Sequence, residues 1–174
     1  MTLRISTASD IDTLLGWIPD EIFGAQWGAL VYQWPLTKAQ ILQRSSLDEV
    51  TSLTLEHQGR ISGFIEVVHE SASECRLCRV IVDAQQRGQG LGALLLRDTL
   101  AFIREQCPSI NRVTLAVFEQ NSGARRCYES VGFQYLPNVR TRQVGAECWT
   151  LLAMVLDISV ERSTNEERPR LSND

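Results

Sequence analysis

Three glycines at alternate positions, Gly88, Gly90 and Gly92, mark the stretch of this 174-residue chain where a binding chemistry is easiest to recognise. An apolar run, Leu77–Val82, precedes them and predicts a buried strand. A helical pattern follows and extends to about Gln106. Glycine lets backbone N–H groups approach an anion, and a helix N-terminus adds unpaired N–H donors and the positive end of its dipole. The stretch therefore predicts a cradle for a phosphate group.

Two phosphate-binding motifs fit this stretch. Gly88, Gly90 and Ala93 match the dinucleotide fingerprint G-x-G-x-x-G/A, which is typical of NAD-binding folds. That fingerprint expects an acidic residue about 20 residues further on, at the end of the next strand. The first acidic residue that closes a predicted strand is Glu119, which lies too far along the chain. The second motif is Q-x-x-G-x-G, formed by Gln85, Gly88 and Gly90, and it requires partners elsewhere in the sequence.

Another motif lies further along the chain, after the predicted strand Arg112–Phe118. It reads Asn121-x-x-Ala124-x-x-x-Tyr128-x-x-x-Gly-Phe and begins about 30 residues after the glycine loop. Asn121 is placed to cap the start of a helix, and Gly132, at the end of the motif, is placed to end that helix. The ordered pair of motifs resembles the two signatures of the GNAT superfamily of N-acetyltransferases, which bind acetyl-CoA. The resemblance covers roughly residues 60–157.

The resemblance implies how acetyl-CoA would be held. Members of the superfamily splay two parallel strands apart, here Leu77–Val82 and Val113–Phe118, and the pantetheine arm lies in the gap. Backbone groups of the first strand bind the pantetheine amides and the acetyl carbonyl, where an N–H stabilises negative charge on the oxygen. The loop holds the pyrophosphate, and Gln85 braces it. The implied cofactor-binding residues are Val80, Ile81, Val82, Gln85, Arg87, Gly88, Gln89, Gly90, Leu91, Gly92, Ala93, Asn121 and Tyr128.

Tyr128 and Glu66 are the candidate catalytic residues. Tyr128 has the position of the family's general acid, which protonates the departing CoA thiolate. Its place on the apolar face of a predicted helix also fits a core tyrosine. An attacking ammonium group has a pKa of about 10 and must lose a proton before it attacks. Glu66, Glu74 and Glu119 lie on or beside predicted strands, and Glu66, in mid-strand, is the candidate base; the family also uses water relays.

The amino-acid composition narrows the range of possible partners and cellular locations. The formal net charge of −4 argues against a nucleic-acid partner and is compatible with cationic amine acceptors. No apolar run approaches the roughly 20 residues of a membrane span, and no signal region is present, so no membrane association is expected. Five cysteines without a disulfide framework favour a reducing cytoplasm. Cys75 and Cys78 form C-x-x-C without a second pair, which predicts packing residues and no metal.

The remaining pattern predicts an α/β fold. Two strands, Val50–His57 and Arg60–His69, are joined as a hairpin through Gln58-Gly59. The expected architecture is the GNAT fold, in which helices flank a central, mixed, largely antiparallel twisted sheet with two splayed parallel strands. We expect one domain over residues 1–157 and a disordered polar tail over residues 158–174.

The function expected from the resemblance is transfer of an acetyl group from acetyl-CoA to a primary amine by direct attack in a ternary complex. The amine is a small molecule, a protein N-terminus or a lysine. The irregular aromatic stretch Asp20–Pro35 is either a satellite hydrophobic cluster or the wall of the acceptor pocket. The alternative function is a non-catalytic acyl-CoA-binding or sensing module on the same fold. A homodimer is expected at the level of the family only.

Overall fold

The computed structural model describes residues 1–28 and 31–159. The polar tail predicted for residues 158–174 lies, from residue 160 onward, outside the described residues. The elements are, in chain order, β1 (Thr2–Ile5), α1 (Ala8–Leu15), α2 (Glu21–Gly28), α3 (Lys38–Ser45), β2 (Val50–His57), β3 (Arg60–His69), β4 (Glu74–Val82), a 3-10 turn (Ala84–Gln86), α4 (Leu91–Gln106), β5 (Arg112–Phe118), α5 (Ser122–Val131), β6 (Gln134–Val144) and β7 (Glu147–Asp157).

The strands form one sheet in the order β1-β2-β3-β4-β5-β7-β6. All neighbouring strands pair antiparallel except β4 and β5, which are parallel and are connected through α4. The predicted hairpin of β2 and β3 has the expected bounds, and Gly59 at its turn has a φ of +72°. The α/β class, with a mixed and largely antiparallel sheet, is therefore confirmed.

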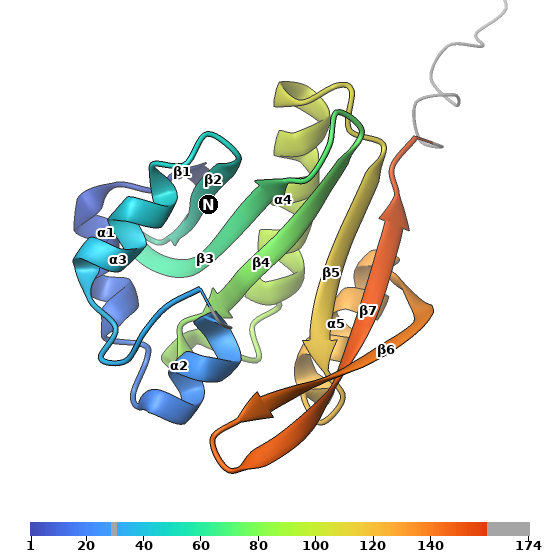
Figure 1. Cartoon of the computed structure of the whole chain (residues 1–174). Helices are drawn as coiled ribbons and strands as arrows, with labels where there is room; N and C mark the ends of the chain where they lie inside the picture. Colours follow the sequence, from blue (N-terminus) through green and yellow to red (C-terminus); the bar gives the residue numbers. More distant parts are fainter. Residues whose placement is uncertain (29–30, 160–174) are drawn as a thin grey trace, which may run out of the picture.

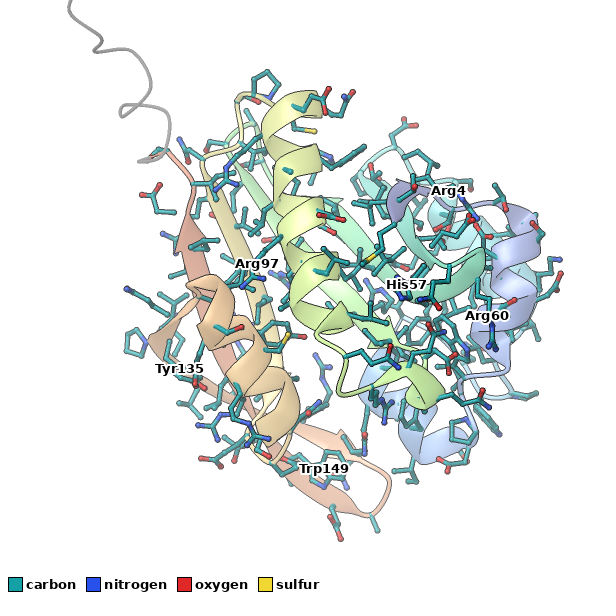
Figure 2. The ribbon with its side chains drawn as sticks, turned by 180° about the vertical axis from the view of Figure 1, so that it is seen from behind. Arg4, His57, Arg60, Arg97, Tyr135 and Trp149 are labelled. Atoms are coloured by element: carbon teal, nitrogen blue, oxygen red, sulfur yellow. The ribbon has the colours of Figure 1, made fainter. Side chains whose placement is uncertain are left out.

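Helices cover both faces of the sheet. Figure 1 shows α1, α2 and α3 in front of the sheet, and Figure 2, seen from behind, shows α4 and α5 on the opposite face. The apolar face of α4 forms the larger core with the sheet, where Leu95, Leu96 and Ile103 are fully buried. A second core lies under α1, α2 and α3. None of the helices in the described part of the chain is long and apolar enough to span a membrane.

Three segments differ from the sequence-based expectation. Helix α2 lies within Asp20–Pro35, where the sequence pattern predicted irregular structure. The apolar residues of this helix do not fall on one face, so the sequence shows no helical periodicity there. The sequence predicts only a short strand at Phe133–Tyr135, whereas β6 extends to Val144; most of its residues are exposed, so no alternation of apolar residues reveals its length. The side chain of Ile158 is fully buried, and its N–H donates to the Asn111 carbonyl (2.8 Å). Ile158 therefore belongs to the larger core.

Candidate active site

The two parallel strands separate at one end of the sheet. Pairing between β4 and β5 begins at Glu74 with Arg112 and ends at Leu77 with Leu115. Both strands continue beyond this point, and their ends diverge, as Figure 1 shows at the lower edge of the sheet. The last residues of β4 therefore have no strand partner on the β5 side. The splay predicted from the resemblance is confirmed.

A β-bulge in β4 lies beside the splay. Opposite the stretch from Phe64 to Glu66 on β3, β4 runs from Cys78 to Ile81, one residue more. Arg79, within the bulge, has a φ of +51°, which is uncommon for a residue with a side chain. After the bulge, Ile81 packs into the core under α1, α2 and α3, whereas Val80 and Val82 pack towards α4.

The bulge is fixed by a buried side-chain hydrogen bond. The Nε1 group of Trp27, in α2, donates to the carbonyl of Arg79 at 2.9 Å. Because a buried carbonyl without a partner would destabilise the fold, this bond fixes the direction of the chain immediately before Val80. Helix α2 thus sets the backbone geometry of β4 at the splay.

The glycine loop continues from β4 into α4. Gly88 and Gly90 have φ values of +78° and +76°, and a Cβ atom at either position would meet nothing within 4 Å. These glycines are therefore required by the backbone conformation, and the space beside them is open. The first helical hydrogen bond of α4 joins Leu94 N to Gly90 O (3.1 Å), so the preceding N–H groups of the first turn have no partner within the helix.

Gly92 has a different role from the other two. It lies inside α4, and a Cβ atom there would approach the Sγ atom of Cys127, in α5, to 3.1 Å. The absence of a side chain thus allows α4 and α5 to pack closely beside the loop.

Gln86, rather than the predicted Gln85, braces the loop with its side chain. Gln86 Oε1 accepts a hydrogen bond from Ser62 Oγ (2.8 Å), and its Nε2 group donates to Asp83 Oδ2 (2.9 Å). The side chain of Gln85 is exposed, and its backbone N–H donates to Asp83 Oδ1 (3.0 Å). The 3-10 turn directs the second glutamine towards β3. The linear motif contains no signal for this choice.

A cavity of about 1060 Å³ extends from the glycine loop, along the splay, to the hairpin of β6 and β7. Most of the predicted binding residues line it. These are Val80, Ile81, Val82, Arg87, Gly88, Gly90, Leu91, Gly92, Ala93, Asn121 and Tyr128. Gln85, Gln89 and Glu66 are not among the lining residues.

Tyr128 lies on α5 and faces the cavity with its side chain almost completely buried. Its ring contacts Phe133 edge-on, with the ring centroids 6.2 Å apart. Its hydroxyl makes no hydrogen bond to another described residue. Burial raises the pKa of Tyr128 well above the usual value for a phenol, and the nearby Cys127 and Cys78 raise it further. The group is therefore protonated throughout the neutral range.

Asn121 begins α5, as the sequence predicts. Its Oδ1 atom accepts a hydrogen bond from Ala124 N at 3.2 Å, which caps the helix. The residue also lines the cavity. Capping and ligand contact are therefore compatible at this position.

Glu66 lies behind residues that line the cavity, in a network of buried and half-buried side chains. Its carboxylate has no exposed surface, and its Oε2 atom accepts hydrogen bonds from Arg79 and from Arg44 Nε (2.9 Å). Its Oε1 atom accepts a hydrogen bond from the Tyr32 hydroxyl (3.1 Å). Arg44 and Arg79 line the cavity, whereas Glu66 does not. The carboxylate joins α3, the segment after α2 and the bulge of β4.

The part of the cavity beyond the splay contains residues that the two motifs do not include. Phe23, Gln26 and Trp27 come from the stretch Asp20–Pro35. Trp27 also belongs to the core under α1, α2 and α3, so the stretch is both a hydrophobic cluster and a cavity wall. Arg142 and Trp149, on β6 and β7, complete this part. In the sequence, Gly145 lies between two strand patterns, and this glycine is the signal that could have predicted the hairpin.

The described residues fit acetyl-CoA. A positive-φ loop, a helix N-terminus and Arg87 offer donors and charge to a pyrophosphate. The β4 edge beyond Leu77, which has no strand partner towards β5, offers backbone groups to the amides of a pantetheine arm. The cavity connects these two features without interruption. The site therefore suits an elongated ligand that is anionic at one end and contains amides along its length.

Comparisons with known proteins agree with this arrangement. The model of the acetyltransferase (GNAT) family matches residues 19–133. N-alpha-acetyltransferase 40 of Saccharomyces cerevisiae is 36% identical over 98 residues, which are 52% of this chain and 34% of that protein. The chain therefore matches about a third of the length of that relative.

Solved structures share the fold over most of the chain. The spermidine N-acetyltransferase from Vibrio cholerae, in complex with CoA and spermine, has a TM-score of 0.76 at 15% identity, over 91% of this chain and 95% of that one. The ribosomal-protein-alanine N-acetyltransferase from Brucella melitensis has a TM-score of 0.70 at 21% identity, over 90% of this chain and 99% of that one. Such identities show the fold alone. Because the family model matches well over half of the sequence, the chain belongs to the GNAT family of N-acetyltransferases.

Proposed function

We propose that this protein transfers an acetyl group from acetyl-CoA to a primary amine, by direct attack of the amine in a ternary complex. The observation that carries the proposal is the cavity of about 1060 Å³, which joins the glycine loop to the open region beyond the splay. One ligand can thus extend from the loop to the splay, while the acceptor enters from the side of α2 and the β6–β7 hairpin. Acetyl-CoA would supply the acetyl group as a reactive thioester.

The glycine loop would bind the pyrophosphate of acetyl-CoA. The N–H groups of Gly88, Gly90 and the first turn of α4 would donate to its oxygens, and Arg87 would add a charge-assisted contact. Gln86 supports this role because its side-chain hydrogen bonds hold the loop against Ser62 and Asp83. A preorganised loop loses little conformational entropy when the anion binds.

Backbone groups at Val80–Val82 would hold the pantetheine arm and the acetyl carbonyl. The bulge at Arg79 supports this role, because it changes the direction of the backbone where pairing with β5 has ended. An N–H directed at the carbonyl oxygen would stabilise the negative charge that develops during attack. Asn121, at the start of α5, would contact the arm where it leaves the splay.

Tyr128 would act as the general acid. Its place in the lining of the cavity supports the role, because a phenol is protonated at neutral pH and has a proton to donate to the departing sulfur. The proton would move from the tyrosine oxygen to sulfur as the bond between sulfur and the acetyl carbon breaks. Asn121 and the glycine loop would keep that sulfur near the phenol by holding the rest of the arm.

The amine must lose its proton before it attacks, and Glu66 is the base that the sequence predicts. Its full burial and its contacts with Arg44, Arg79 and Tyr32 favour a different contribution, in which it holds the arginines and the bulge in place. Glu70 is the carboxylate among the described lining residues, and it is paired with Arg76 at 2.7 Å. Water relayed through the open part of the cavity would then accept the proton.

Thermal unfolding with acetyl-CoA tests the cofactor, with NAD as the competing ligand. Ligand at 100 times its Kd adds about 2.7 kcal/mol to the free energy of unfolding. For a chain of this length, this stabilisation raises the Tm by roughly 5 to 10 °C. We expect the shift with acetyl-CoA and not with NAD. A shift with NAD alone would show that the dinucleotide fingerprint is the correct motif.

Two glycine variants localise the binding. Gly90→Ala and Gly59→Ala each place a side chain at a φ above +70° in open space, so both are expected to lower the free energy of unfolding by about 1 to 2 kcal/mol. Gly59 lies in the β2–β3 turn and does not line the cavity. We expect only Gly90→Ala to weaken acetyl-CoA binding, by about tenfold or more, because the Cβ atom would occupy the open space beside the loop and the strained backbone would move its N–H groups away from the pyrophosphate. Equal affinity in both variants would exclude the loop as the pyrophosphate site.

A further inference from the structure

The charge inside the cavity is opposite in sign to the charge of the chain. The formal net charge of the whole protein is −4. The charged side chains among the described lining residues are Glu70, Arg44, Arg76, Arg79, Arg87 and Arg142. Arg76 pairs with Glu70, and Arg44 and Arg79 share the single buried carboxylate of Glu66. Positive charge is therefore in excess at the end of the cavity that lies beyond the splay.

Arg142 contributes most to this excess. It lies on β6 opposite Trp149 of β7, and its guanidinium carbon is 5.8 Å from the centroid of the Phe118 ring. The side chain is half-buried and forms no ion pair with a described residue. Burial lowers the pKa of Arg142, and the neighbouring positive charge of Arg79 lowers it further. Arg142 thus has no carboxylate partner among the described residues, and its positively charged neighbour Arg79 is already paired with Glu66.

This arrangement is unfavourable unless a ligand supplies the missing negative charge. Like charges in a partly dehydrated site repel each other, and Arg142, unlike Arg79, has no carboxylate partner among the described residues. Arginine is also the side chain best suited to bind a carboxylate through two parallel hydrogen bonds. The aromatic rings of Phe118 and Trp149, which meet edge-on with centroids 5.2 Å apart, form an apolar wall beside this position.

The position of the two arginines relates them to the acceptor. Arg79 directly precedes Val80, the start of the segment assigned to the acetyl carbonyl, and its positive charge acts on Arg142. Arg87, at the other end of the cavity, is the cation of the glycine loop. Arg142 instead comes from the hairpin of β6 and β7, and Figure 2 shows Trp149 of this hairpin below the lower end of α5.

We propose that the acceptor is a small amine that carries a carboxylate near the attacking nitrogen, and that Arg142, with Arg79, binds this carboxylate. The inference rests on the proposed function and names the substrate class of the same site. A polyamine is excluded by the same charges, because it would bring further positive charge to two arginines. Arg142 is thus a specificity-determining residue, while transfer itself depends on Tyr128 and the β4 backbone.

The test compares α-amino acids with the amines that result from removing their carboxylate. With acetyl-CoA, the wild-type protein should release CoA thiol with a kcat/KM about 10- to 100-fold higher for each amino acid than for its decarboxylated partner. In Arg142→Gln this ratio should fall to near one, mainly through KM, and Arg142→Lys should restore part of it. Arg140→Gln changes an exposed arginine on the same strand that does not line the cavity, and it should keep the wild-type ratio.

A binding measurement makes the test independent of turnover. In the presence of CoA, calorimetry should show that N-acetyl amino acids bind the wild-type protein about tenfold or more tightly than they bind Arg142→Gln. Equal binding, or a wild-type preference for the decarboxylated amines, would overturn the inference. If Arg142→Gln instead lowered the affinity for acetyl-CoA itself, Arg142 would bind the phosphates of the cofactor, and the inference would also fail. A wild-type protein without any response to acetyl-CoA would contradict the proposed function as a whole.

Discussion

Replacing Tyr128 with phenylalanine should lower kcat by about 100- to 10,000-fold, the usual contribution of a general acid, and leave acetyl-CoA affinity nearly unchanged. The ring is 7% exposed and packs edge-on against Phe133, so phenylalanine keeps its contacts. The hydroxyl has no hydrogen-bond partner among the described residues, so its removal leaves no described donor or acceptor unpaired. The variant therefore changes the chemistry and very little of the fold. Steady-state release of CoA thiol measures the effect.

The matched control for this variant is Tyr135→Phe. Tyr135 lies on β6 outside the cavity, and its hydroxyl contacts Arg125 and Glu129 on the surface of α5 (Figure 2). We expect wild-type kcat in this control. If Tyr128→Phe kept full turnover, Tyr128 would be a core residue and the acid would lie elsewhere. If the wild-type protein bound acetyl-CoA but acetylated no amine, the alternative of an acyl-CoA-binding module would be favoured.

The pH dependence gives a second readout for Tyr128. A phenol whose pKa is raised above its usual value of about 10 stays protonated at every pH below that value. Activity should therefore rise with pH as the amine loses its proton and should not fall between about pH 8 and 10. A decline in that interval, absent from Tyr128→Phe, would show that the phenol titrates with a normal or lowered pKa.

Replacing Glu66 with glutamine should lower the free energy of unfolding by about 3 to 5 kcal/mol, as expected when one partner of a buried ion pair is removed. The Oε2 atom of Glu66 accepts from both Arg44 and Arg79, so the substitution leaves the buried Arg79 and the half-buried Arg44 without a counter-ion. For a chain of this length the Tm should fall by roughly 6 to 20 °C. Thermal or denaturant unfolding measures the effect.

The control is Glu56→Gln. Glu56 pairs with Arg4 at 3.5 Å on the surface, and such pairs contribute at most about 1 kcal/mol. The kinetics of Glu66→Gln then separate two roles. If Glu66 holds the bulge and the arginines, the folded variant should keep a measurable kcat and show a raised KM for the acceptor. Loss of turnover with unchanged KM and an altered pH profile would instead identify Glu66 as the base.

Local chemical signals were sufficient for much of the fold. The β2–β3 hairpin was predictable because two alternating strands flank Gln58-Gly59, and Gly59 has the positive φ that such a turn requires. Helix α5 was predictable because Asn121 caps it and Gly132, with a φ of +109°, ends it. In each case one residue type satisfies one backbone requirement, so the sequence pattern is unambiguous.

The binding features that sequence could not reveal depend on contacts between distant segments. The bulge at Arg79 is held by Trp27 and Glu66, which are 52 and 13 residues away in sequence. Arg142 reaches the cavity because β6 continues far beyond its short apolar pattern and pairs with β7. Neither residue belongs to a local motif. The glycine loop could thus be recognised before the structure, and the charge of the acceptor region could not.

Amide hydrogen exchange with and without acetyl-CoA tests the central claim most directly. We expect acetyl-CoA to slow exchange at two segments, Val80–Val82 and Gly88–Ala93, because the pantetheine arm and the pyrophosphate would accept hydrogen bonds from their N–H groups. Amides of the β2 core, such as those of Leu53 and Leu55, serve as the internal control and should not change. Slower exchange at both segments would support acetyl-CoA in the splay between β4 and β5. Binding of acetyl-CoA without protection of either segment would contradict that site.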